Sequence, residues 1–265
     1  MIISSYSISS PGLVRIENQD NLYINGVYRN DITDNSVFQY ANKSTVGGLY
    51  AVADGMGGEK HGELAALLAV KQLKEIVISD CQFQLTQYLM SQNVVICDLI
   101  MQNNKIRIGS TFVGLLICSE RASIINIGDS RAYLYRDGIL KQLSRDHTQV
   151  QQMIDMGLVS VADARAHPAR HKLSQHLGIF PAEMVIEPYS IEIEIEEDDI
   201  FLLCSDGLTD MVDDLTISKI LSTTAGEQEK AEMLFETALR NGGKDNITIV
   251  LIQAKEGELF YERTV

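Results

Sequence analysis

Short apolar runs separated by turn residues occupy much of the chain and predict β-strands. Residues 112–118, 122–127 and 131–135 form such runs one after another, a pattern typical of consecutive antiparallel strands. Residues 191–196 alternate strictly between isoleucine and glutamate, which predicts a strand with one apolar and one acidic face. Further strands are predicted near residues 3–8, 49–53, 199–204 and 247–252.

Other segments carry apolar residues at helical spacing. Intervals of three and four in residues 64–77 and 84–103 predict two long amphipathic helices. Residues 29–44 are polar with few apolar anchors, and we expect a loop or irregular hairpin there. Shorter helices are predicted at residues 147–156, 215–222 and 227–241.

Composition is that of an ordinary globular protein, with 45% hydrophobic and 22% charged residues. A length of 265 residues is enough to bury a substantial core, and we expect one domain over residues 1–265. The formal charge of −14 argues against binding nucleic acid or an anionic membrane, because both require clustered lysine and arginine. No signal peptide or apolar stretch of about 18 residues is visible, so a cytoplasmic protein is expected.

The cysteines and histidines indicate neither a zinc site nor a disulfide framework. No Cys-x-x-Cys pair and no His-Glu-x-x-His spacing occurs. His61 lies near Asp54 but is interpreted as a residue at a helix start. Buried thiols are expected at the four cysteines, Cys81, Cys97, Cys118 and Cys204.

Candidate chemistry begins at Asp54, which follows the predicted strand 49–53 and precedes Gly55. A glycine at a strand end lets the backbone come close to a bound ion. Asp-Gly is also the commonest hairpin turn, and this segment alone favours the turn.

Three more aspartates occupy comparable positions. Asp129 lies in a tight turn between strands, Asp206 follows strand 199–204, and Asp245 precedes the last strand. Each has a simpler alternative, such as a turn whose aspartate bonds its own backbone. Converging carboxylates repel one another unless cations lie between them. Oxygen ligands alone select hard ions, Mg²⁺ or Mn²⁺.

Two basic features each have two interpretations. Arg15 lies a few residues from Asp20 beside a Pro-Gly turn. It either forms an ordinary surface ion pair or binds an oxyanion, for which its planar fork is suited. Residues 165–176 gather arginines, histidines and a lysine. They form either a solvated loop or a contact for a phosphorylated or acidic segment of a partner.

Taken together, the motifs resemble the ordered set of the PP2C-type, or PPM family, metal-dependent serine/threonine protein phosphatases of bacteria. The resemblance spans nearly the whole chain, and six motifs in order are far more specific than any one. They are Arg15 with Asn18-Gln19-Asp20, Ala53-Asp54-Gly55-Met56-Gly57-Gly58, Gly109-Ser110-Thr111, Gly128-Asp129-Ser130-Arg131, Ser205-Asp206-Gly207 and Lys244-Asp245-Asn246-Ile247-Thr248.

The resemblance implies an α+β fold. Its centre would be a β-sandwich of two mostly antiparallel sheets, flanked by helix pairs in a four-layer αββα arrangement. A flap beside the site is expected at about residues 146–169. The implied activity is hydrolysis of phosphoserine and phosphothreonine in proteins, by a monomer that opposes a bacterial serine/threonine kinase.

The resemblance also implies roles for particular residues. Asp54 would bridge two ions, Mn²⁺ or Mg²⁺, and the Gly55 carbonyl would ligate one of them. Asp206 and Asp245 would hold the second ion, and Asp129 with Asp206 matches the acids of a third. Arg15 would bind the substrate phosphate and Asp20 would orient metal-bound water. Two metal ions about 3.5–4 Å apart can activate a water molecule and neutralise the charge that develops during the reaction. No covalent phosphoenzyme is then needed.

Some residues depart from the family pattern. Gln19 stands where many members have glutamate, and Met56 where eukaryotic members carry a histidine proposed as general acid. Residues 174–178 replace the Thr-Arg-Ala-Leu-Gly of bacterial relatives. The alternative function is a catalytically silent regulatory module that binds phosphoproteins or a kinase. Loss of metal-binding acids would mark it, and only Gln19 points that way.

Overall fold

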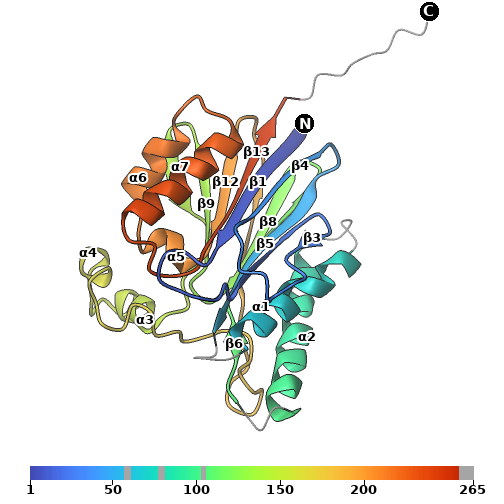
Figure 1. The fold of residues 1–265 in the computed structure, drawn as a ribbon, viewed down its shortest axis with the longest axis vertical. Coiled ribbons are helices and arrows are strands. Elements are labelled where there is room, and N and C mark those ends of the chain that lie inside the picture. The colour runs from blue at the N-terminus through green and yellow to red at the C-terminus, as the bar shows by residue number, and fades with distance from the viewer. Residues whose placement is uncertain (57–60, 77–80, 103–105, 257–265) are drawn as a thin grey trace, which may run out of the picture.

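The computed structural model of the chain describes residues 1–56, 61–76, 81–102 and 106–256. Two antiparallel sheets lie face to face, and helices cover the outer face of each (Figure 1). This is the four-layer α+β sandwich that the resemblance implied. None of the helices in the described ranges combines the length and apolar character needed to cross a bilayer.

The first sheet has the strand order β10-β9-β12-β13-β1-β4, which places the N-terminal strand beside the C-terminal one. The second sheet has the order β11-β8-β7-β5-β2-β3, and β6 pairs with β5. The first sheet contains β1 (Ile2–Ser10), β4 (Phe38–Ser44), β9 (Arg131–Arg136), β10 (Ile139–Gln142), β12 (Ile200–Cys204) and β13 (Ile247–Lys255). The second contains β2 (Asp20–Ile24), β3 (Val27–Tyr28), β5 (Gly48–Met56), β6 (Gly109–Ser110), β7 (Phe112–Cys118), β8 (Arg121–Ile127) and β11 (Tyr189–Glu194).

Helices pack on the outer faces and in one projecting segment (Figure 1). The second sheet is covered by α1 (Gly62–Lys71), the 3₁₀ turn η1 (Gln72–Glu75) and α2 (Cys81–Gln102). The first sheet is covered by α5 (Asp206–Thr209), α6 (Asp214–Leu221) and α7 (Glu227–Arg240). The projecting segment carries α3 (Gln149–Asp155) and α4 (Val161–Ala164), within the range expected for the flap.

Continuous apolar runs in the central strands serve two cores at once. In β13, Val250 and Ile252 belong to the cluster between the sheets, whereas Ile249 and Leu251 belong to the cluster beneath α6 and α7. Successive side chains of a strand point to opposite faces, so a strand buried on both sides is apolar throughout. Each fully buried large side chain contributes about 1.5–3 kcal/mol to the free energy of unfolding.

The prediction of a loop at residues 29–44 was wrong for its second half. Residues 38–44 form β4, which pairs along its length with β1 at the edge of the first sheet. Its side chains are half-buried or exposed in turn, and Phe38 and Tyr40 pack against the core between the sheets. An edge strand needs little apolar surface because backbone pairing holds it, which explains its polar composition.

The strands predicted at residues 112–118, 122–127 and 131–135 are all present, but the hairpin alternative for the turn at Asp129 was wrong. β7 pairs with β8, but β9 pairs with β10 and β12 in the other sheet. Gly128 has a φ of +98° where the chain crosses between the sheets, a backbone conformation that favours glycine. The helix predicted at residues 64–77 is shorter than expected: α1 ends at Lys71 and continues as the 3₁₀ turn η1.

Candidate metal and phosphate site

Most of the predicted site residues line one cavity of about 510 Å³ at one end of the sandwich. Antiparallel pairing explains why two of them are neighbours, because the end of one strand lies beside the start of the next, whereas Asp54 and Asp129 come from the second sheet, which packs against the first. Asp206 follows the end of β12 and Asp245 precedes the start of the adjacent β13. The lining includes the predicted residues Arg15, Asp54, Gly55, Asp129, Asp206 and Asp245, together with Gln19, Met56, Thr111, His171, Leu173, His176 and Asn246.

Asp20 lies behind this cavity rather than in its lining. It lies on β2, is 1% exposed, and is the direct cross-strand neighbour of Asp54 on β5. Ser205 Oγ donates a hydrogen bond to Asp20 Oδ2 over 2.7 Å. Asp20 Oδ1 is buried and has no hydrogen-bond partner among the described residues. Buried polar atoms are normally satisfied, so this oxygen is poised for a ligand or water in the site.

Asp54 lies within a strand, because β5 continues to Met56. The hairpin alternative for Asp54-Gly55 is therefore wrong. Two other motifs support this position: Asp54 N donates to Thr111 Oγ1 over 3.0 Å, and Thr111 Oγ1 lies 2.6 Å from Ser130 Oγ. The expected glycines Gly57 and Gly58 lie outside the described residues.

Gly55 permits a close backbone contact rather than an unusual φ. A Cβ at this position would lie 2.1 Å from the Gly62 carbonyl oxygen and 2.6 Å from the Gln19 carbonyl oxygen. Gly55 N also donates to the Gln19 carbonyl over 3.2 Å. The missing side chain thus lets β5, the start of α1 and the N-terminal loop meet beside Asp54.

Replacing Gly55 by alanine is expected to lower the free energy of unfolding by at least about 1–3 kcal/mol, because backbone atoms must move to admit the methyl group. Phosphatase activity is expected to fall with it, since the displaced strand carries Asp54. Urea denaturation measures the first effect. Gly226→Ala is the matched control, because no atom of the described residues lies within 4 Å of a Cβ built there. Equal stability of the two variants would contradict the argument.

Asp206 and Asp245 are held by a second close contact. A Cβ at Gly207 would lie 1.9 Å from the Asn246 carbonyl oxygen, so the start of α5 touches the segment just before β13. Thr248 N donates to Ser205 Oγ over 3.0 Å, which links the same two segments. The motifs around residues 205 and 245 therefore form one unit in space.

Arg15 pairs with Asp245, not with a neighbouring acid in the sequence. Arg15 Nη2 lies 2.8 Å from Asp245 Oδ2, and the arginine side chain is 57% exposed. The Asn246 side chain positions this loop: it donates to the Glu17 carbonyl over 2.8 Å and accepts from Gln19 N over 2.8 Å. An exposed guanidinium thus stands at the mouth of an acidic cavity.

Crowding of carboxylates shifts their proton affinities. Burial raises the pKa of Asp54 well above its ordinary value, and repulsion from Asp20, Asp206, Asp129 and Asp245 adds to the shift. Burial likewise raises the pKa of Asp129, with Asp206 contributing. Burial, with repulsion from Asp206 and Asp245, raises the pKa of Asp20 to about 7. This arrangement favours cations, and its oxygen donors fit hard divalent ions.

None of the cysteines whose side chains the structure describes lines this cavity. Cys97 and Cys204 are buried, as expected, and Cys118 is partly exposed. Burial raises the pKa of the Cys204 thiol to about 12, so it is not a thiolate nucleophile at neutral pH. The side chain of Cys81 lies outside the described set.

Sequence patterns did not predict that His171 contacts the acidic residues of the site. Its Nδ1 lies 3.5 Å from Asp206 Oδ2 and its Nε2 lies 3.2 Å from Asp210 Oδ2. The contact with Asp206 raises the pKa of His171. Arg170 Nη2 also approaches Asp210 Oδ2, at 3.5 Å. Some of the basic region therefore has acidic partners within its own chain, which no spacing rule for histidine ligands would have found.

Another missed residue is Arg29, which lies in the segment predicted to be a loop. It is 5% exposed, and its guanidinium donates to the carbonyls of Asn18, Asp20 and Asp34. A buried arginine that binds three carbonyls fixes the path of the N-terminal motif. Its isolated position among polar residues carries no sequence signal for that role.

Comparison with known proteins places the chain in a family. Residues 30–241 match the family described as Protein phosphatase 2C. The chain belongs to the protein phosphatase 2C family. The resemblance found in the six motifs is thereby confirmed, and the comparisons favour a phosphatase over a catalytically silent module.

Relatives and solved structures agree over most of the chain's length. The serine/threonine phosphatase Stp of Listeria monocytogenes is 31% identical over 256 residues, covering 91% of this chain and 92% of the relative. The crystal structure of Mycobacterium tuberculosis PstP superposes with a TM-score of 0.80 at 32% identity, covering 97% of this chain and 100% of that one. A structure of the PstP catalytic domain in complex with 2 manganese ions gives a TM-score of 0.76 at 31% identity, with the same coverage.

Proposed function

We propose that this protein phosphatase 2C hydrolyses phosphoserine and phosphothreonine in proteins with the help of Mn²⁺ or Mg²⁺. The observation that carries the proposal is the convergence of Asp54, Asp206 and Asp245 on one cavity, with Asp129 beside them. These carboxylates, with the Gly55 carbonyl, would hold two ions, and Asp129 with Asp206 a third. The manganese ions in the PstP structure support the choice of metal.

When bound, the ions would supply charge neutralisation for the phosphate and lower the pKa of water. The chain's own residues supply the rest of the reaction. Arg15 is exposed at the cavity mouth and binds the phosphate oxygens through its planar guanidinium. Asp20 would act from behind the cavity, as the cross-strand neighbour of Asp54: its Oδ1, buried and without a partner among the described residues, is available to accept a hydrogen bond from a water bound beside Asp54.

Protonation of the leaving oxygen does not fall to a side chain at position 56. Met56 lines the cavity but has no proton to give. Solvent water can reach the seryl or threonyl oxygen and protonate it instead. This proposal keeps the reaction of the family and predicts a slower protonation step than a histidine would provide.

Release of phosphate from p-nitrophenyl phosphate and from a phosphothreonine peptide tests this function. We expect turnover with Mn²⁺ that chelator removes and added metal restores. A protein that binds Mn²⁺ but releases no phosphate from either substrate would contradict the proposal and favour the silent module.

Replacing Arg15 by alanine is expected to lower kcat/KM for the phosphopeptide by about 10- to 100-fold, mainly through KM. The loss corresponds to about 1.5–3 kcal/mol, the contribution of a hydrogen bond to a charged group. Steady-state kinetics measures it, with Arg121→Ala as control. Arg121 is an exposed arginine that pairs with Glu192 and is not among the residues lining the cavity. An unchanged KM in Arg15→Ala would remove the phosphate-binding role.

The remaining properties expected from the sequence stay predictions. They comprise a single catalytic domain over residues 1–265 with a flap at about 146–169, a monomeric state, a cytoplasmic location and an opposing serine/threonine kinase. His171 and Leu173, which lie just after the expected flap range in the chain, line the cavity. That position fits a role in contacting the protein around the phosphorylated residue.

A further inference from the structure

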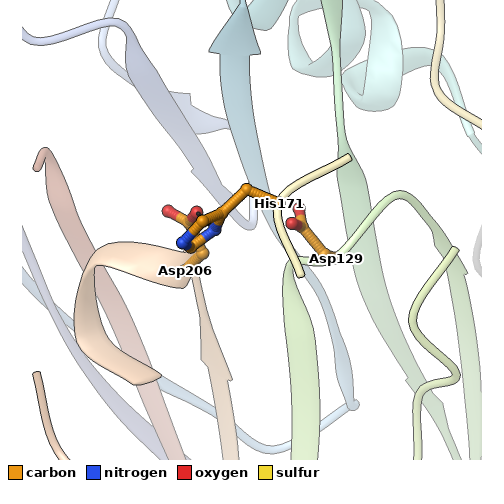
Figure 2. A group of neighbouring side chains, drawn as sticks. All are labelled: Asp129, His171 and Asp206. Carbon is orange, nitrogen blue, oxygen red and sulfur yellow. Dashed lines mark ion pairs between the residues drawn. The ribbon is translucent and has the colours of Figure 1, made fainter. Parts of the chain in front are cut away.

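Asp129, His171 and Asp206 form a cluster that combines two carboxylates with an imidazole. One donor atom from each side chain lies within 4.8 Å of the others. Figure 2 shows the three side chains extending toward one another from three separate segments. They are the turn after β8, the segment after α4 and the start of α5. Adjacent and opposite ligands of one octahedral ion lie about 3–4 Å apart, so small side-chain rotations would bring these donors onto one ion.

The second ring nitrogen of His171 already has the partner that a metal-binding histidine needs. Nε2 lies 3.2 Å from Asp210 Oδ2, while Nδ1 faces Asp206. Metal-bound histidines almost always donate their other ring N–H to a carboxylate or carbonyl, which fixes the tautomer and the ring orientation. A proton on Nε2 that is donated to Asp210 leaves the Nδ1 lone pair directed toward the cluster.

We propose that His171 is a nitrogen ligand of an ion that Asp129 and Asp206 also bind. The family resemblance accounts for the two carboxylates, and His171 would add an imidazole to them. The inference depends on the proposed function only because both require an ion at Asp206. Imidazole favours first-row transition metals, whereas carboxylate and water suit Mg²⁺. This site should therefore prefer Mn²⁺ to Mg²⁺ more strongly than an all-oxygen site would.

The same ligand would tie the flap to the metal centre. Arg165 Nη2 donates to the Thr209 carbonyl over 3.2 Å, and Arg170 contacts Asp210 on the same side. These contacts already hold the segment after α4 against α5. A bond from His171 to the ion would add the strongest link in this set. Metal occupancy and flap position would then be coupled.

The test uses the full chain and Mn²⁺ alone. Titration calorimetry counts the bound ions, and three-pulse electron spin-echo envelope modulation detects ¹⁴N bonded to Mn²⁺. We expect nitrogen modulation in the wild type and its loss in His171→Ala, with affinity for one ion reduced at least tenfold. His167→Ala, in the same segment, is the matched control and should keep both signals. The His167 ring accepts a hydrogen bond from Ala169 N.

Asp210→Asn separates a ligand role from simple packing. It should weaken binding of the same ion by about 10- to 100-fold, as loss of such outer partners does, while nitrogen modulation remains. A ring that merely packs against α5 would show no such effect on affinity.

Three outcomes would overturn the inference: two bound ions only, a third ion without nitrogen modulation, or modulation that is lost in His176→Ala instead. Failure of the proposed function looks different. A protein with nitrogen-bound Mn²⁺ but no phosphatase activity would contradict the proposed function and leave the ligand assignment standing. An active enzyme without nitrogen modulation would support the proposed function and contradict the assignment of His171 as a ligand.

Discussion

Asp54→Asn is expected to lower kcat by more than about 100-fold while making the metal-free protein more stable. Loss of a group that only orients a metal ligand costs about 10- to 100-fold in affinity or activity, and Asp54 is proposed to bind ions directly. The gain in stability has a separate cause. Burial and four neighbouring carboxylates raise the pKa of Asp54, so its charge at neutral pH opposes folding in the absence of metal.

This combination distinguishes a lost ligand from a damaged fold. Phosphate release with Mn²⁺ measures the first effect, and urea denaturation in chelator measures the second. Asp137→Asn is the matched control, because Asp137 lies exposed in the turn between β9 and β10 at a φ of +51°, which asparagine tolerates. An inactive Asp54→Asn protein of lowered stability would indicate misfolding and would contradict the electrostatic account.

The second large effect concerns pH. In chelator, the free energy of unfolding of the wild type is expected to fall as pH rises from about 5 to about 8. The pKa of Asp20 is about 7 in the folded chain and 3.8 in the unfolded reference. Between these values the folded state binds more protons, so stability from this group is full below the lower value and is lost as pH rises through the higher one.

The raised pKa values of Asp54 and Asp129 act in the same direction. Together these groups should change stability by a few kcal/mol, since one pKa unit corresponds to about 1.4 kcal/mol. Saturating Mn²⁺ should reduce this slope, because bound ions favour the ionised carboxylates.

Urea denaturation at several pH values, with and without metal, measures this dependence. Asp20→Asn should show a shallower slope than the wild type in chelator. Identical slopes for the two proteins would mean that Asp20 does not titrate with a raised pKa.

The strand and helix patterns predicted most of the fold because core burial dictates them. The run at residues 247–252 is apolar on both faces, and in the structure it separates two cores. β4 was missed because an edge strand held by backbone pairing needs few apolar side chains. The transfer of β9 to the other sheet was missed because a tight turn at Gly128 resembles a hairpin in the sequence.

The order of the motifs in the sequence predicted the acidic residues of the site, but not the residues that contact or position them. Asp54, Asp206 and Asp245 were predicted from their positions at the ends or starts of predicted strands. Antiparallel pairing of β12 with β13 brings Asp206 beside Asp245, and the packing of the two sheets brings Asp54 to the same cavity. His171 and Asp210 could not be predicted from spacing, because their contact depends on how the segment after α4 folds back onto α5. Arg29 was missed for a similar reason, since its three carbonyl partners are defined only by the folded loop.

The converging carboxylates are proposed to hold divalent ions between them. Crystals grown with Mn²⁺ and measured at the manganese absorption edge test this proposal most directly. The account predicts anomalous peaks within about 2–2.5 Å of carboxylate oxygens of Asp54, Asp206 and Asp245. Clear density for these side chains with no anomalous peak between them, in protein saturated with Mn²⁺, would contradict it.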